Sequence, residues 1–186
     1  MAPDGRGGQV AVLQRGRRPK LAVQFVRRPR TGRVRSIIVR RGPAENFMFS
    51  RPAAAPDGWT AVAFERRPRI TELAGVGYVL AVTPNGRSIL TRLTASAAVS
   101  HPAVSVTRGG RGAAGFIGED YLPGGAIFRT RTSFVPLTAG RPQLGAALVF
   151  DRVKVAIVNV VMTSNRRDRA RVVWEEGGRA LASRLG

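Results

Sequence analysis

The chain has 186 residues, and its 31 Lys and Arg against 11 Asp and Glu give a formal net charge of +20. Hydrophobic residues make up 44 % of it, enough for the core of one ordinary domain, so wholesale disorder is excluded. The absence of cysteine excludes disulfides, thiolate catalysis and cysteine metal sites. The surplus charge is almost entirely arginine, which binds oxyanions through a two-pronged guanidinium and favours nucleic acid over an anionic membrane as partner.

Residues 1–41 are the most basic part of the chain, and we expect a partly disordered arm there because like charges repel one another. Two short apolar stretches, Leu21–Val26 and Val34–Val39, flank the sequence RRPRTGR. They are compatible with edge strands that dock on a neighbouring surface or with a basic hairpin that contacts phosphates. The residues predicted to contact nucleic acid are Arg15, Arg17, Arg18, Lys20, Arg27, Arg28, Arg30, Arg33, Arg35, Arg40 and Arg41.

The middle of the chain reads as a hinge followed by short strands. Residues 42–58 are rich in Pro and Ala and predict a hinge, with the folded domain spanning 59–186. Alternating apolar residues predict a kinked edge strand within Trp59–Leu73, and Val76–Val82 predicts a buried strand. The Pro84–Gly86 sequence PNG predicts a hairpin turn, and Ser88–Ala98 is compatible with the returning strand or a short helix.

The second half is expected to hold the core. Residues 100–125 are rich in glycine and predict flexible connections. Leu144–Phe150 alternates apolar residues as a half-buried strand does, and Val153–Met162 reads as a strand covered on both faces. Ser164–Gly186 predicts an amphipathic C-terminal helix broken at two glycines. Short strands between Gly and Pro turns predict an all-β antiparallel sandwich with a short C-terminal helix.

Catalytic chemistry is not indicated. His101 is the only histidine, and neither Glu119–Asp120 nor Glu175–Glu176 forms an acid–base pair, because adjacent residues on a strand face opposite ways. The chain is therefore predicted not to be an enzyme. Its start lacks the long apolar segment of a signal peptide, and the apolar run near Val155–Met162 is too short to span a bilayer. We expect a soluble protein that is intracellular when made.

Residues Phe134–Asp151 resemble the shell-domain signature of icosahedral plant RNA virus coat proteins of the tombusvirus and sobemovirus type. The signature reads aromatic-x-Pro, seven residues, Gly-x-aliphatic-x-aliphatic-x-aromatic, and an Asp soon after. In this chain Leu144 stands at the place of the Gly and Ala146 at the place of a larger aliphatic residue. Phe134 and Pro136 match its start, and Phe150 and Asp151 match its end. The resemblance implies a jelly-roll shell that assembles with further copies of itself, and a basic arm that binds RNA without reading its sequence.

The same resemblance bears on metal binding at Asp151. In the family, paired aspartates here help bind calcium between subunits, since a hard cation needs several oxygen ligands. Val153 stands at the place of the second aspartate, and Arg152 is suited instead to a subunit salt bridge. We therefore predict no cofactor, with Asp151 as the single candidate ligand for interface calcium.

The leading hypothesis is thus a capsid protein that packages genomic RNA and resides in the virion, or in the host cytoplasm during assembly. The alternative is a non-capsid viral RNA-binding accessory protein, such as a movement protein or a silencing suppressor. A ribosome-associated structural protein is a third, weaker option. Closed particles containing protected nucleic acid would distinguish the first hypothesis from the other two.

Overall fold

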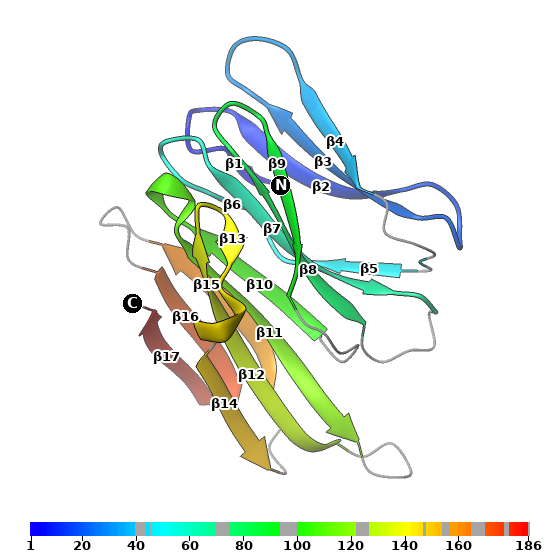
Figure 1. The fold of residues 1–186 in the computed structure, drawn as a ribbon, viewed down its shortest axis with the longest axis vertical. Coiled ribbons are helices and arrows are strands. Elements are labelled where there is room, and N and C mark those ends of the chain that lie inside the picture. The colour runs from blue at the N-terminus through cyan, green and yellow to red at the C-terminus, as the bar shows by residue number, and fades with distance from the viewer. Residues whose placement is uncertain are drawn as a thin grey trace.

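The computed structural model describes residues 1–39, 44, 46–69, 75–93, 100–121, 127–146, 148–153, 157–164, 170–176 and 179–185. These residues form antiparallel sheets and two short 3-10 turns, as Figure 1 shows. The predicted all-β antiparallel sandwich is confirmed. No helix in this described part of the chain is long and apolar enough to cross a bilayer.

The first sheet is built from the most basic part of the sequence. Its strands are paired in chain order: β1 (Ala2–Pro3), β2 (Gln9–Arg15), β3 (Ala22–Arg28) and β4 (Arg35–Val39). For the two apolar stretches, compatible with docked edge strands or with a basic hairpin, the structure shows the paired antiparallel strands β3 and β4. Alternation explains it, because Val10, Val23 and Phe25 are buried on one face while the charged residues between them face outward or lie in the loops.

The second sheet forms the centre of the molecule. It contains β5 (Asn46–Phe49), β7 (Thr60–Arg67), β8 (Val76–Val82) and β9 (Ser88–Arg92), with β6 (Ala53–Ala54) paired to β7. The predicted strand of β8 and the turn that follows it are confirmed. Ser88–Ala98, which is compatible with a strand or a helix by its sequence, begins as the strand β9.

The second half of the chain forms two further sheets. One contains β10 (Ser100–Val106), β11 (Gly112–Tyr121), β12 (Ile127–Thr138), β13 (Arg141–Pro142) and β14 (Leu148–Val153). The other contains β15 (Ile157–Ser164), β16 (Ala170–Glu176) and β17 (Arg179–Leu185), and β15 lies against β10 and β11. The 3-10 turns are η1 (Arg108–Gly110) and η2 (Leu144–Ala146).

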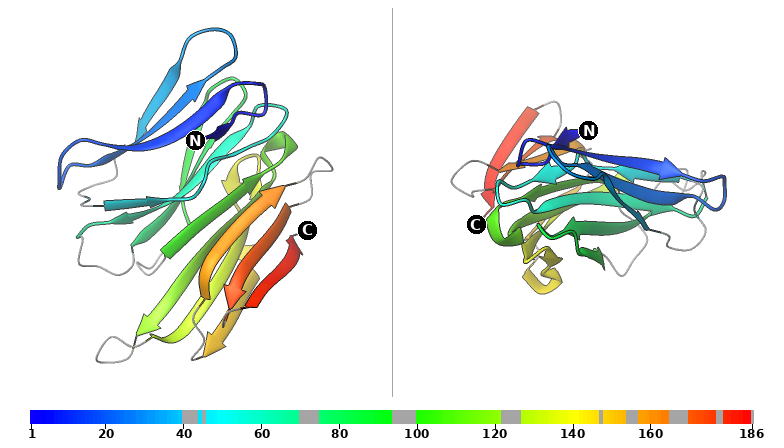
Figure 2. Two further views of the ribbon diagram at one scale, coloured as in Figure 1. Left: turned by 180° about the vertical axis from the view of Figure 1, so that it is seen from behind. Right: turned by 90° about the horizontal axis from the view of Figure 1, so that it is seen from above.

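The central sheet is buried on both faces, which makes the fold a stack of layers (Figures 1 and 2). One face, with Phe64 and Leu80, packs against Val23 and Phe25 of the first sheet. The other face, with Ala63, Val79 and Ala81, packs against β10, β11 and β12. Aromatic contacts reinforce the first core, since the rings of Phe64 and Tyr78 stack with centroids 5.3 Å apart.

The expected disorder of the arm is wrong for the described residues 1–39, because their apolar side chains belong to the same core as β7 and β8. Burial of those side chains offsets the charge repulsion on which the expectation rested. The expected hinge also contains ordered structure, since β5 and β6 pair with β7. The boundaries at residues 41 and 58 themselves remain predictions.

Three further expectations need correction. The C-terminal helix is instead the hairpin of β16 and β17, and its break at Gly177–Gly178 lies outside the described residues. The stretch expected to be loop-rich contains β10 and β11, whose small residues pack in the second core. The alternating Leu144–Phe150 segment begins as the turn η2, and its strand starts only at Leu148.

The jelly-roll topology is not confirmed. Most strands that pair in a sheet also follow one another along the described chain, as in a meander. The pair of β12 and β14 is an exception, because the two-residue strand β13 lies between them in sequence. A meander forms when successive strands are joined by short turns, and the Gly- and Pro-containing turns of this chain supply them.

Candidate polyanion-binding groove

Strand register places the basic residues of the first sheet at its two ends. Gln9 pairs with Arg28, so the loop before β2 and the loop between β3 and β4 lie at the same end. Arg15 pairs with Ala22, so the turn between β2 and β3 lies at the opposite end. Basic residues that are close in sequence are therefore separated by the length of a hairpin.

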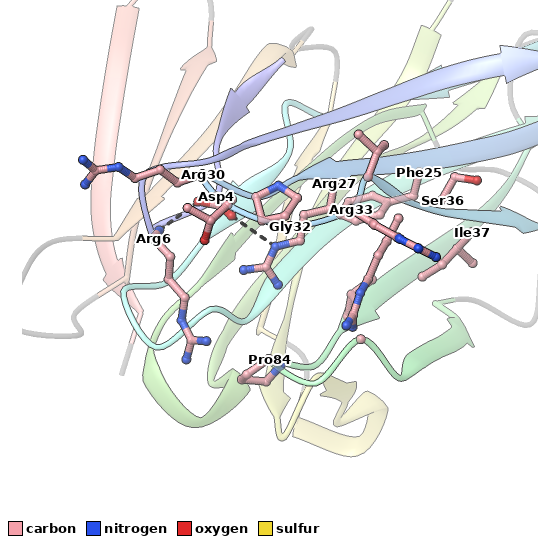
Figure 3. Close-up of a pocket in the computed structure, with 16 residues that line it drawn as sticks. Asp4, Arg6, Phe25, Arg27, Arg30, Gly32, Arg33, Ser36, Ile37 and Pro84 are labelled. Carbon is pink, nitrogen blue, oxygen red and sulfur yellow. Dashed lines mark hydrogen bonds and ion pairs between the residues drawn. The ribbon is translucent and has the colours of Figure 1, made fainter.

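A groove with a volume of about 880 Å³ opens at the first of these ends. Its walls come from the loop before β2, from the β3–β4 hairpin and from the turn between β8 and β9, as Figure 3 shows. Among the described residues that line it, Asp4 is the one carboxylate. The arginines that line it are Arg6, Arg27, Arg30, Arg33 and Arg35.

Asp4 is fully buried and organises one wall of the groove. Its Oδ1 accepts hydrogen bonds from the backbone N–H groups of Arg6 (2.8 Å) and Gly8 (2.6 Å). Its Oδ2 lies 3.2 Å from the Nε of Arg27. Burial raises the pKa of the Asp4 carboxyl, but the two backbone hydrogen bonds and the Arg27 guanidinium together hold that pKa below its usual value.

Three of the arginines also hold the groove together through backbone carbonyls. Arg27 donates to the oxygen of Gly58 at 3.2 Å, and Arg35 donates to that of Asn85 at 3.1 Å. Arg6 donates to the carbonyl of Asp57. These bonds tie the first sheet to the loops of the second. Neutral carbonyls leave the positive charges of Arg6 and Arg35 in place, whereas the charge of Arg27 is paired with Asp4.

Arg30 and Arg33 differ from the other three. Both are exposed on the loop between β3 and β4, and neither has an ion pair or hydrogen bond with any residue the structure describes. Figure 3 shows Arg30 extending away from the other labelled arginines. A guanidinium without an internal partner retains all of its donors for a bound oxyanion.

The groove also has an apolar side, formed by Ile37, Val82 and Pro84. Phe25 lies beneath it but is only 1 % exposed, so its ring cannot serve as a stacking platform. Phe47 is buried in the core as well, and Phe49 packs against Phe64. The arrangement can therefore bind negative charge and offer apolar contact to a sugar or to the edge of a base. Among the described residues, no side chain is placed to distinguish one base from another.

The structure brings together part of the predicted set of nucleic-acid contacts. Arg27, Arg30, Arg33 and Arg35 line the groove, and Arg28 lies beside them on the outer face of β3. Arg15, Arg17, Arg18 and Lys20 lie instead at the turn between β2 and β3, at the opposite end of the sheet. Arg40 and Arg41 lie outside the described residues.

Sequence reasoning missed Arg6 as a groove residue. A signal for it was present, because Asp4 is followed at once by the glycine-rich GRGG, a pattern typical of a turn in which an Asp side chain binds nearby backbone N–H groups. Such a turn folds Arg6 back toward the sheet. The approach of the β8–β9 turn to the β3–β4 hairpin could not be predicted, because no local sequence pattern specifies which distant segments pack together.

The candidate calcium ligand lies far along the chain from this groove. The backbone of Asp151 pairs with Arg131 in the β12–β14 ladder. Among the described residues, no three His, Cys, Asp or Glu side chains come together as a metal site would require. Calcium binding at Asp151 therefore stays a prediction without further support.

Comparison with known proteins adds fold information alone. No family model matches the chain, and no curated protein matches it. Among solved structures it is similar to the crystal structure of the polysaccharide lyase Uly1, with a TM-score of 0.51 and 12 % sequence identity. The match covers all of this chain and 48 % of the lyase, so the chain spans about half the length of that protein. At this identity the likeness indicates a shared β architecture and does not carry over the activity.

Proposed function

We propose that this protein binds a linear polyanion, with single-stranded RNA as the first candidate, through the arginine-lined groove of its N-terminal sheet. The observation that carries the proposal is that five arginines from two separate segments line one groove, where the single carboxylate among the described lining residues is internally paired. Positive charge held at fixed positions raises the local concentration of an anionic ligand and binds its phosphates by hydrogen bonds.

The binding is expected to be independent of sequence. None of the described residues that line the groove offers an exposed aromatic ring, so affinity is expected to come from charge and counterion release. The arginines tied to carbonyls set the shape of the groove, while Arg30 and Arg33 supply free donors. A rigid groove loses less conformational entropy on binding than a disordered arm does.

The capsid role remains part of this proposal as one use of RNA binding. Its support is the Phe134–Asp151 pattern, in which Phe134 is buried within β12. The absence of catalysis stays a proposal drawn from the single histidine and the scattered carboxylates of the sequence. Self-assembly and localisation in the virion are proposals that rest on the resemblance. Electron microscopy of purified protein tests them, because closed particles with nuclease-protected RNA support the capsid role and soluble RNA complexes support the accessory-protein alternative.

The groove is tested by titrating a labelled 20-nucleotide oligouridylate in a fluorescence anisotropy assay. The double variant Arg30→Gln/Arg33→Gln is expected to weaken binding roughly tenfold or more, because two charge-assisted contacts are lost. The slope of log K against log salt should also become shallower by about 1.4, since each phosphate contact on a single strand contributes about 0.7.

The matched control is Arg111→Gln/Arg141→Gln, which removes the same charge from two exposed positions, Arg111 between η1 and β11 and Arg141 in β13. It should change affinity only slightly. Equal losses in both double variants would mean that net charge alone is responsible, and the groove would be refuted as a site. Heparin as competitor provides a second measurement, because a densely charged polyanion should displace the oligouridylate from a site that binds by charge. Failure of heparin to displace it would refute charge-driven binding at the groove.

A further inference from the structure

The turn between β2 and β3 carries a second basic cluster at the end of the sheet opposite the groove. Arg15, Arg17, Arg18 and Lys20 are all exposed there, and none has an ion pair within the described part of the chain. The turn has a defined shape, because the N–H of Lys20 donates to the carbonyl of Arg17 at 2.7 Å. We call these four residues the turn cluster.

The backbone at the turn cluster is also anchored to the rest of the fold. The N–H of Ala44 donates to the carbonyl of Pro19 at 2.8 Å, and Lys20 forms a bridge with Ala44. Gly16 has a φ of +105°, and a Cβ at that position would lie 2.7 Å from the carbonyl oxygen of Lys20. The turn cluster is therefore presented on a fixed scaffold, as the groove is.

The outer face of the hairpin connects the two clusters. Val10, Val23 and Phe25 face the core, so their neighbours along β2 and β3 face outward. The outward residues include Arg15 near the turn cluster and Arg28 near the groove. Between them lie polar or apolar residues without charge: Ala11, Leu13, Gln24 and Val26.

No negative charge interrupts this surface. Residues 1–39 contain ten Lys and Arg and a single carboxylate, that of Asp4. Asp4 is fully buried and paired with Arg27, so it is not presented on the outer face. An anionic chain lying along the hairpin would thus meet no repulsion from this sheet over its whole length.

The separation of the clusters defines a minimum ligand length. β3 has seven residues, and at about 3.3 Å per residue the strand spans roughly 20 Å. Along the axis of a stacked strand there is one phosphate per about 3.4 Å, so about six stacked nucleotides span the length between the two clusters. A ligand of four nucleotides is too short.

We propose that the groove, entered at the exposed loop residues Arg30 and Arg33, and the turn cluster are two contact sites for one linear polyanion. Between them the polyanion crosses the end of the sheet and runs along the outer face of the β2–β3 hairpin. This inference rests on the proposed function and specifies that the ligand is a chain longer than about six charged units. Tethering makes the second contact intramolecular, which raises overall affinity well above that of either site.

The experiment compares oligouridylates of 4 and 20 nucleotides on four proteins: the unaltered chain, the groove variant Arg30→Gln/Arg33→Gln, the turn variant Arg17→Gln/Arg18→Gln and the control Arg111→Gln/Arg141→Gln. We expect the turn variant to weaken binding of the 20-mer by roughly 100-fold, because the tethered contact is lost. It should leave the groove's affinity for the 4-mer unchanged. The charge-retaining variant Arg17→Lys/Arg18→Lys should recover most of the affinity for the 20-mer.

The outcomes separate the two proposals. If the groove variant weakens binding of the 20-mer and the turn variant matches the control, bridging is refuted and the groove stands. If both variants match the control, the groove fails as well. Equal losses for the 4-mer and the 20-mer in the turn variant would also refute bridging. Circular dichroism and thermal melting accompany each variant, and all substituted residues are exposed, so folding is expected to be preserved.

Discussion

Replacing Asp4 by Asn tests whether the buried carboxylate maintains the wall of the groove. The substitution preserves size and one carbonyl oxygen, so the hydrogen bonds from the backbone of Arg6 and Gly8 can persist in weaker form. It places an amide where Oδ2 faced Arg27, whose side chain is only 11 % exposed. Arg27 is then left with the carbonyl of Gly58 as its remaining hydrogen-bond partner among the described residues.

The burial of Arg27 and Asp4 determines how much folding free energy the substitution Asp4→Asn should remove. Breaking a buried ion pair by removing one partner costs about 3–5 kcal/mol, and the residual bond to Gly58 places the expected loss near the lower end, about 3 kcal/mol. For a domain of this length, that corresponds to a fall of the melting temperature of roughly 6–12 °C. Urea denaturation followed by circular dichroism measures the change, and the variant Asp57→Asn serves as a less buried control.

The pH dependence has a definite sign. Because the folded-state pKa of Asp4 lies below its usual value of 3.8, the ionised carboxylate stabilises the fold above about pH 4. That contribution is lost as the pH falls through the lowered folded pKa. The unaltered protein should therefore lose more stability between pH 5 and pH 2, roughly, than Asp4→Asn does. Parallel stability curves for the two proteins, or an unchanged free energy of unfolding at neutral pH, would refute the role assigned to Asp4.

Two further substitutions test the packing between layers. Phe64→Ala should destabilise the fold by about 3–5 kcal/mol, measured by urea denaturation, because a fully buried ring in contact with Phe47 and Tyr78 is removed; a loss below about 1 kcal/mol would contradict the assigned core. Gly140→Ala should cost more than Gly109→Ala in thermal melting, although both glycines have positive φ. A Cβ at Gly140 would lie 2.7 Å from the Trp59 ring, whereas nothing lies within 4 Å of one at Gly109, so equal losses would mean that backbone strain alone matters.

The sequence predicted secondary structure correctly where the local residue pattern and the packing in the folded protein favour the same element. Val76–Val82 is apolar throughout, and it forms a central strand buried on both faces with the predicted bounds. The Asn-Gly turn after it works as expected, with Gly86 at a φ of +92°. The apolar stretches around RRPRTGR also became paired strands, because their alternation gives each a buried face.

The failures have a common physical origin in long-range packing. Charge density predicted disorder for residues 1–39, yet Val23 and Phe25 find partners in β7 and β8, some forty to sixty residues away. The C-terminal segment has enough helix-forming residues to predict a helix, but its two halves pair as β16 and β17. Propensity is a weak prior that tertiary pairing overrides.

The candidate site was only partly predictable for the same reason. Arginines in a basic segment are an evident choice for nucleic-acid contacts, and four of them line the groove. The division of that segment into a groove and a turn cluster depends on strand register. A register shift of one residue would exchange the faces of Arg27 and Arg28, so composition alone could not assign their separate roles.

The layered arrangement has a consequence for synthesis on the ribosome. The first sheet is made before its packing partner, so the face with Val10, Val23 and Phe25 stays without a cover until β7 and β8 emerge. An uncovered apolar sheet is a template for aggregation unless charged residues flank its strands. Here the flanking charges are the same arginines that line the groove and the turn. Repulsion between these arginines is expected to keep nascent chains from aggregating. The arginines would thus act during synthesis, before the protein binds a ligand.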